Sequence, residues 1–227
     1  MWIKICGNTT LEDAQFAADA GADALGFIFA PSPRQVNADQ VRRITEKLPR
    51  QVEKYGVFVD ASFGEIVSTV NESGLTGVQL HRASDPLLPL RLREYFQKGL
   101  AIVSVVHFKS ESFEQQLTGL SKDEALDAVL VDSSSARAVG GTGTSFDWLK
   151  ARSAFLHLAP HLKLIAAGGL ASENVKQAIE TLQPWGVDVV SGVESAPGKK
   201  DRERVFAFIR AAHQAEEETM LEKRGKS

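Results

Sequence analysis

The chain has 227 residues, of which 43% are hydrophobic and 24% are charged, with a formal net charge of −3 at pH 7. This is the composition of an ordinary globular protein, and the length suits a single domain of α/β barrel size. The composition excludes a largely disordered chain, and the charge gives no general attraction to nucleic acid or anionic membranes. A small anion is therefore the expected type of partner.

The cysteine count and the hydropathy pattern indicate a cytoplasmic protein. Cys6 is the single cysteine, so no intramolecular disulfide can form. The first residues resemble a strand rather than a basic segment followed by an apolar signal-peptide core. No apolar run approaches the roughly 20 residues that a membrane-spanning helix needs. We therefore expect a reducing environment and no membrane partner.

Strand-like and helix-like segments alternate along the chain. Strands are expected at residues 2–7, 22–29, 55–60, 77–81, 101–108, 128–132, 162–169 and 187–192, and some of these ranges include the turn that ends the strand. Helices are expected at residues 11–20, 38–48, 86–98, 147–158, 172–182 and 201–215, and one more begins after Ser62. Asn37 with Gln40, and Ser62 with Glu65, resemble capping pairs, and Ser172 is the expected cap of its helix.

This rhythm predicts one (β/α)₈ barrel with a parallel eight-stranded core over residues 1–215. The total is short but workable beside the roughly 250 residues of a typical barrel. A doubly wound open sheet is the competing architecture, but the first turn, Cys6–Thr10, lacks the glycine fingerprint of dinucleotide-binding sheets. The charged segment 216–227 is expected to fray or to extend the last helix into solvent.

Candidate chemistry lies at the carboxyl ends of the strands, where barrel active sites form. Lys4 and Cys6 share one face of the first strand, since side chains alternate along a strand. If this face points into the barrel, Lys4 needs a carboxylate partner, and Asp188 and Asp23 are the candidates. A solvent-facing Lys4 is the alternative, as is a Cys6 that serves only as a small buried hydrophobic residue.

Cys6 and Asp132 have opposite requirements if they act as base and acid. An ordinary thiol with a pKa of about 8.5 is mostly protonated at pH 7, so we hypothesise that the charge of Lys4 lowers the pKa of Cys6. A carboxyl that donates a proton near neutrality needs burial or a nearby anion, and the end of an apolar strand offers burial to Asp132. The alternative for Asp132 is a turn carboxylate that caps Ser133–Ser135.

Glycine-rich loops mark a candidate phosphate site. Gly168–Gly169 and Ser191–Gly192 follow the seventh and eighth strands, where barrels commonly bind phosphate through backbone amides. Gly140–Gly143 is a weaker signal, because glycine clusters often form simple turns. Lys199–Lys200 lies nearby and either adds positive charge or forms a solvated basic pair.

Arg34 and two histidines complete the candidates. Arg34 lies in a proline-stiffened loop after the second strand, where its guanidinium can hold a carboxylate by two hydrogen bonds. His81 and His107 end strands, and each is more often a packing or hydrogen-bonded residue than a catalyst. The histidines and carboxylates show no convincing metal-ligand spacing, so no metal is expected.

A series of motifs at the strand ends resembles phosphoribosylanthranilate isomerase of tryptophan biosynthesis. The resemblance extends from the first strand to the last helix, and its specificity comes from the order of the motifs. They are Lys4–Gly7, Gly26–Phe29, Gly56–Val59, Val78–His81, Gly140–Gly143 with Phe146–Trp148, and Ser191–Glu194.

The resemblance implies a (β/α)₈ fold without a cofactor and an Amadori rearrangement of N-(5-phosphoribosyl)anthranilate to 1-(2-carboxyphenylamino)-1-deoxyribulose 5-phosphate. It implies that Cys6 is the general base and Asp132 the general acid. Arg34 is expected to meet the anthranilate carboxylate. The other implied substrate-binding residues are His81, Gly141, Gly143, Gly168, Gly169, Ser191 and Gly192.

The sequence departs from the family pattern at Asp60, where asparagine is common, and at Arg82, where glycine usually follows the histidine. Arg82 bears on substrate selectivity rather than on the reaction class. Other phosphosugar barrels, such as pentose-phosphate epimerases and indole-glycerol-phosphate synthases, are the alternative enzymes. A phosphate-binding barrel without catalysis and a thiol-redox protein are further alternatives, although no second cysteine is present for a redox role. Both a monomer and a homodimer are compatible with the sequence.

Overall fold

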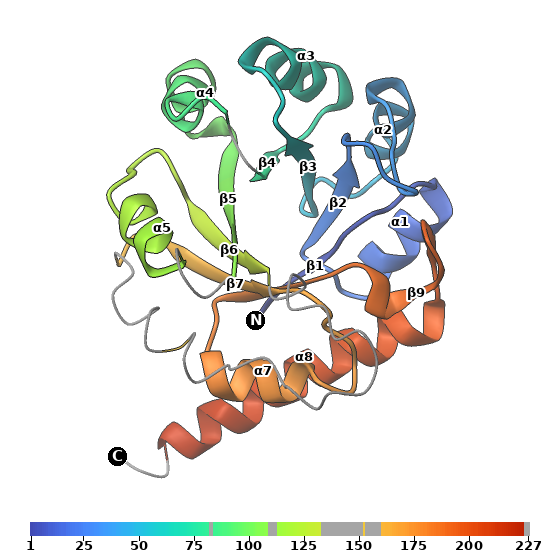
Figure 1. Cartoon of the computed structure of the whole chain (residues 1–227). Helices are drawn as coiled ribbons and strands as arrows, with labels where there is room; N and C mark the ends of the chain where they lie inside the picture. The colour runs from blue at the N-terminus through green and yellow to red at the C-terminus, as the bar shows by residue number, and fades with distance from the viewer. Residues whose placement is uncertain (82–83, 109–112, 133–151, 153–159, 225–227) are drawn as a thin grey trace.

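The structure of the chain is a computed structural model that describes all residues except 82–83, 109–112, 133–151, 153–159 and 225–227. Eight parallel strands form a closed barrel in which each strand pairs with its neighbours in chain order and β8 closes onto β1. The helices lie outside the ring of strands (Figure 1). The expected (β/α)₈ architecture is confirmed, and the open-sheet alternative is wrong.

The elements have the following bounds. The strands are β1 (Trp2–Ile5), β2 (Ala24–Ile28), β3 (Glu53–Val59), β4 (Gly77–His81), β5 (Ala101–His107), β6 (Ala128–Asp132), β7 (Lys163–Ala167) and β8 (Gly186–Val189). The helices are α1 (Leu11–Asp19), α2 (Ala38–Thr45), α3 (Phe63–Ser73), α4 (Leu88–Phe96), α5 (Phe113–Leu120), α7 (Val175–Leu182) and α8 (Arg202–Arg224). Most of the helix expected at residues 147–158 lies outside the described residues. Helix α5 was not expected, although Phe113 and Leu117 are buried at helical spacing.

Two apolar layers stabilise the barrel, one on each side of its wall. Alternate side chains of a strand point to opposite faces, so Ile3 and Ile5 of β1 face the helices while Trp2 faces inward. The outer layer, which includes Phe27, packs between strands and helices. The inner layer contains Trp2 and Leu130, among others, and lies inside the barrel. The polar side chains described below lie on the same inward-facing positions.

The expected caps of α2 and α3 are confirmed. The side chain of Asn37 accepts a hydrogen bond from the amide of Gln40 at 2.9 Å, and the Gln40 side chain accepts one from the amide of Asn37 at 2.9 Å. Ser62 and Glu65 form the same reciprocal pair at the start of α3. Each pair satisfies amides that have no partner within the helix, and thereby fixes where the helix begins.

The expected cap of α7 is wrong. The helix begins at Val175, and Asn174 rather than Ser172 precedes it. The hydroxyl of Ser172 instead donates to the carboxylate of Glu173 at 2.9 Å. The side chain of Asn174 accepts from the amide of Ala171 and donates to the carbonyl of Gly169, so it holds the loop that follows β7. A short polar side chain in such a loop has several backbone groups within reach, and sequence alone does not choose among them.

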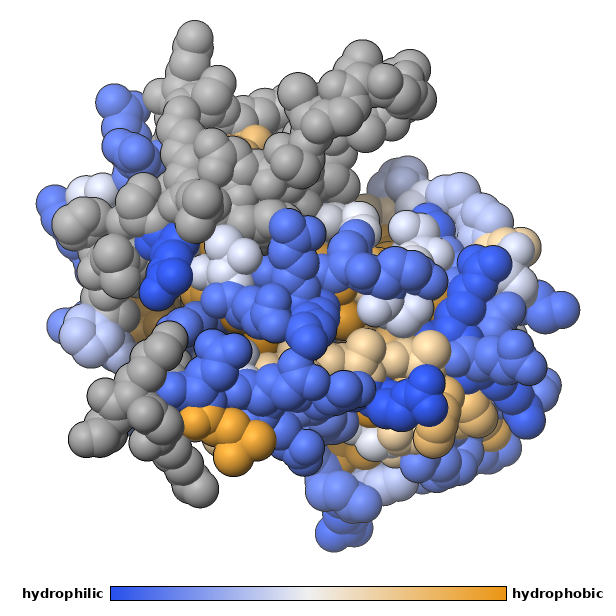
Figure 2. All heavy atoms as spheres, turned by 90° about the horizontal axis from the view of Figure 1, so that it is seen from below, coloured by the Kyte–Doolittle hydropathy of each residue, from blue (hydrophilic) through white to orange (hydrophobic). Residues whose placement is uncertain are grey.

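Helix α8 packs beside α7 and continues past the expected end at Ala215 to Arg224 (Figure 1). The amino group of Met1 pairs with Glu216, and Lys176 pairs with Glu218, so the start of the charged segment contacts the barrel. The face seen from below is mostly hydrophilic over the described residues (Figure 2). No helix in the described part of the chain has the length and hydropathy needed to cross a membrane.

A small hairpin follows β8 and lies against the start of the chain. It comprises the short helix η2 (Ser191–Val193) and the strands β9 (Glu194–Ala196) and β10 (Lys199–Lys200). The hydroxyl of Thr9 donates to the carbonyl of Gly198 at 2.7 Å, and the amide of Lys200 donates to Asp13 at 3.0 Å. These contacts fix the hairpin to the loop and helix that follow β1.

Candidate active site

A cavity of about 330 Å³ opens at the carboxyl ends of the strands. The residues that line it come from seven of the eight strands or from the loops that follow them. Among the described residues, the lining includes the expected site residues Cys6, Arg34, His81, Asp132, Gly168, Gly169 and Ser191. The structure therefore brings together most of the side chains that sequence analysis selected.

Cys6 directly follows β1 and is buried, with 2% of its surface exposed. Its amide donates to the carbonyl of Val189 at 2.9 Å, which ties the start of the first loop to β8. Gly26 on β2 provides the space for the thiol, because a Cβ at that position would collide with the Cys6 sulfur. The sequence places glycine at the point where the base candidate needs room.

Lys4 is buried beneath Cys6 and has a carboxylate partner, as predicted. Its ammonium donates to Asp188 at 2.9 Å and to the amide oxygen of Gln79 at 2.8 Å. Lys4 lies opposite Asp188 in the pairing of β1 with β8, and that register brings the two charges together. The other candidate, Asp23, is not the partner, since its carboxylate accepts from the amide of Ile3.

The hypothesis that the pKa of Cys6 lies below that of an ordinary thiol is wrong. Burial raises the pKa of Cys6, and the nearby charge of Asp188 raises it further. The charges of Lys4 and Lys200 and a hydrogen bond from Lys4 act in the opposite direction but do not outweigh burial. Lys4 itself keeps its proton: burial alone would lower its pKa, but Asp188 and Cys6 raise it overall. A thiolate at position 6 therefore depends on Lys4.

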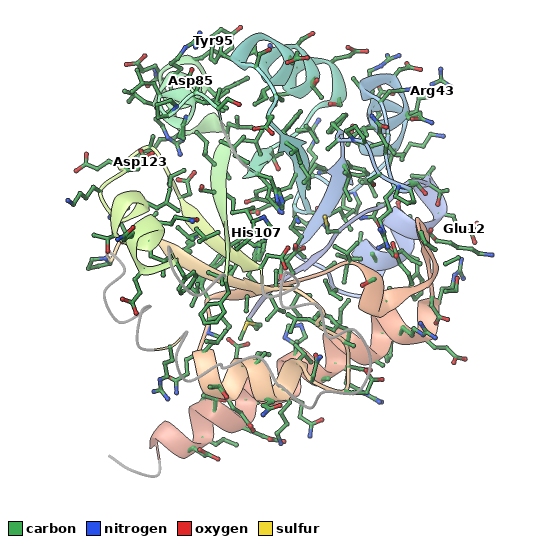
Figure 3. All side chains as sticks on the ribbon, in the orientation of Figure 1. Glu12, Arg43, Asp85, Tyr95, His107 and Asp123 are labelled. Atoms are coloured by element: carbon green, nitrogen blue, oxygen red, sulfur yellow. The ribbon has the colours of Figure 1, made fainter. Side chains whose placement is uncertain are left out.

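Asp132 lies at the end of β6 on the other wall of the cavity, with 19% of its side chain exposed. It is paired in register with His107 of β5, and the Nδ1 atom of His107 lies 3.9 Å from a carboxylate oxygen of Asp132. The His107 ring is 5.8 Å from that of His81, whose Nε2 lies 3.0 Å from the side-chain amide of Gln79. His107 is near the centre of the ring of strands (Figure 3). Polar groups thus continue across the cavity from Lys4 to Asp132.

Arg34 lines the cavity, and its guanidinium pairs with a carboxylate of the chain itself. Nε and Nη2 donate to Glu194 at 2.9 and 2.6 Å. The stem of Arg34 crosses Gly7, whose φ of +77° and close contact with Arg34 leave no room for a larger residue. The hydrogen bonds that Arg34 donates to Glu194 raise the pKa of Arg34, so this side chain stays charged.

Lys200 is not part of a solvated basic pair. Its side chain is fully buried and donates to the carbonyl of Cys6 and, at 3.1 Å, to Glu194. No role of Glu194 is predicted from the sequence, although this residue ends the motif Ser191–Glu194. Because Glu194 lies 160 residues from Arg34 in the sequence, no local pattern reveals their pairing.

The loops after β7 and β8 meet at the cavity. Gly168 and Gly169 have positive φ angles of 93° and 65°, and both line the cavity with Ser191. Gly192 is not a lining residue. A Cβ there would overlap the carbonyl of Leu170, so glycine lets the two loops pack closely. Gly141 and Gly143, with Arg82 and Phe146–Trp148, lie outside the described residues.

Comparisons with known proteins agree with this geometry. Residues 3–211 match the family model "N-(5'phosphoribosyl)anthranilate (PRA) isomerase". An N-(5'-phosphoribosyl)anthranilate isomerase from Pelobacter propionicus is 39% identical over 96% of this chain and 98% of its own. The crystal structure of phosphoribosyl anthranilate isomerase from Thermotoga maritima is 34% identical, with a TM-score of 0.78, over 94% of this chain and 99% of its own. Another similar structure holds reduced 1-(o-carboxyphenylamino)-1-deoxyribulose 5-phosphate, with 32% identity and a TM-score of 0.76 over 94% and 99% of the two chains.

Proposed function

Because the chain belongs to the family of N-(5'-phosphoribosyl)anthranilate isomerases, we propose that it converts N-(5-phosphoribosyl)anthranilate into 1-(2-carboxyphenylamino)-1-deoxyribulose 5-phosphate with Cys6 as base and Asp132 as acid. The observation that carries this assignment is that the single thiol of the chain and Asp132 line one cavity. The reaction is an isomerisation in which no atom is gained or lost, and an acid and a base carry out its proton transfers.

The first step is opening of the furanose ring. Asp132 donates a proton to the ring oxygen, the bond from that oxygen to C1 breaks, and the nitrogen lone pair forms an iminium with C1. Asp132 suits this step because its carboxyl group is half-buried at the cavity wall, within reach of a bound sugar. His81 lines the same cavity and suits a polar contact with a sugar hydroxyl.

The second step is removal of the proton from C2. The Cys6 thiolate takes this proton, and the electrons of the C–H bond form the double bond of an enolamine while the iminium nitrogen is neutralised. Tautomerisation of the enolamine then returns a proton to C1 and gives the ketone at C2. The buried ammonium of Lys4 stabilises the thiolate that this step requires.

The remaining residues hold the two ends of the substrate. Backbone groups of Gly168, Gly169 and Ser191 suit the phosphate, since these loops follow β7 and β8. Arg34 suits the anthranilate carboxylate, because it lines the cavity and its pairing with Glu194 raises its pKa, so that the guanidinium stays charged. Contacts to these non-reacting groups orient C1 and C2 between base and acid.

The test is an assay of the purified protein that follows consumption of the fluorescent anthranilate-linked substrate. We expect turnover by the wild type, and growth without tryptophan when the gene is supplied to an auxotroph that lacks the isomerase. Asp132→Asn is the matched variant, because it keeps the size of the side chain and removes the acid. A protein that binds phosphate but neither turns over the substrate nor complements the auxotroph contradicts the proposal.

A further inference from the structure

Arg34, Glu194 and Lys200 form a cluster of three charges beside the cavity. Glu194 lies between the two cations, with its side chain 3% exposed, and also accepts from the amide of Gly198 at 3.2 Å. Burial alone would raise the pKa of Glu194, but hydrogen bonds and charges from Arg34 and Lys200 lower it overall. The cluster therefore contains one carboxylate and two cations.

The pairing leaves part of the guanidinium outside the contact with Glu194. A guanidinium carries five N–H donors in a planar fork. Glu194 takes the edge formed by Nε and Nη2, and Nη1 takes no part in the pair. The edge formed by Nη1 and Nη2 has the geometry that binds a second carboxylate by two hydrogen bonds.

Glu194 is itself held in place by contacts within the hairpin. It begins β9 and lies opposite Lys200 of β10, while its carbonyl accepts from Arg204 at 2.6 Å. Lys200 also donates to the carbonyl of Cys6, so one buried side chain contacts both the proposed base and the partner of Arg34. The position of the guanidinium is thereby linked to that of Cys6.

We propose that Glu194 is a positioning residue that fixes Arg34 across Gly7, so that the edge of its guanidinium formed by Nη1 and Nη2 selects a substrate whose aryl ring carries a carboxylate. This inference rests on the proposed function and deepens it, because it assigns the selectivity for the aryl acid to a residue that does not contact the substrate. One excess positive charge in the cluster suits one incoming carboxylate.

The test compares binding of two ligands by calorimetry. One is the reduced product analogue, reduced 1-(o-carboxyphenylamino)-1-deoxyribulose 5-phosphate, and the other is the same compound without the carboxylate. We expect wild type to prefer the carboxylated ligand and Glu194→Gln to reduce that preference by about tenfold or more, with a larger effect on KM than on kcat. Glu194→Asp keeps the negative charge but shortens the side chain, and we expect this variant to lose part of the preference for the carboxylated ligand.

Glu12→Gln is the matched control, because it removes an exposed pair with Arg202 at 2.9 Å outside the cavity. It should leave both affinities unchanged. Should Glu194→Gln fail to fold, Arg34→Lys provides the second test, since lysine keeps the positive charge but lacks the planar N–H donors of the guanidinium. A preference that persists in the folded variants, or that increases in Glu194→Gln, overturns the inference. Failure of wild type to turn over the substrate or to bind the carboxylated analogue instead counts against the proposed function.

Discussion

Replacing Lys4 with methionine tests whether the buried ammonium makes Cys6 a usable base. Lys4 is the donor that stabilises the thiolate by charge and by a hydrogen bond. A hydrogen bond to a charged group contributes about 1.5–3 kcal/mol, which corresponds to a thiolate population roughly ten- to a hundredfold lower at fixed pH when it is removed. We therefore expect Lys4→Met to raise the pKa of Cys6 and to slow turnover by a similar factor.

The assay is the rate of alkylation by a small reagent as a function of pH. Cys6 is the single cysteine, so every labelled thiol reports on this position. Lys4→Met leaves Asp188 buried without its cation, which is costly for folding. The double variant Lys4→Met/Asp188→Asn removes both charges, and its Cys6 pKa should lie above that of wild type but no higher than in Lys4→Met. An unchanged or lower pKa in either folded variant refutes the assigned role of Lys4.

Three further predictions concern positions around the cavity. Gly26→Ala should abolish most turnover, because the new methyl group overlaps the thiol of Cys6 and lies 3.0 Å from its Cα. Gly64→Ala is the control and should leave activity unchanged, since a methyl group there has no atom within 4 Å. Gly192→Ala should weaken competitive inhibition by inorganic phosphate about tenfold or more, since the new methyl group forces apart the loops after β7 and β8. Unchanged inhibition would show that these loops do not form the phosphate site. The folded pKa of Glu194 is lowered, so its stabilisation is present above the ordinary value of about 4.3 and is lost as pH falls through the lower folded pKa. Chemical unfolding below about pH 4.3 should therefore show a shallower loss of stability in Glu194→Gln than in wild type, and equal slopes would contradict this.

The barrel was predictable because its strands have a strong local signal. Continuous apolar runs that end in polar residues, such as Ala128–Asp132, predict buried strands, and helical spacing between them predicts the crossovers. The same alternation placed Lys4 and Cys6 on one inward face. The Asn37 cap was predictable for a similar reason, since both of its partners lie within one turn.

The electrostatics of the site were less predictable, because they depend on contacts between distant segments. Lys200 resembles a surface lysine in sequence but is buried against Glu194 and Cys6. The charge of Lys4 was anticipated, whereas the larger effect of burial on Cys6 depends on how completely the fold excludes water. The pairing of Arg34 with Glu194 follows from closure of the barrel, which brings the loop after β2 against the hairpin after β8.

Cleavage of the C2–H bond by wild type and by Cys6→Ala tests most directly whether Cys6 is the base. Substrate that carries deuterium at C2 is compared with unlabelled substrate in single-turnover experiments. We expect slower turnover of the deuterated substrate by wild type and a loss of about 10²–10⁴-fold in the rate of the Cys6→Ala protein. Cleavage of C2–H by Cys6→Ala at the wild-type rate would contradict this role of Cys6.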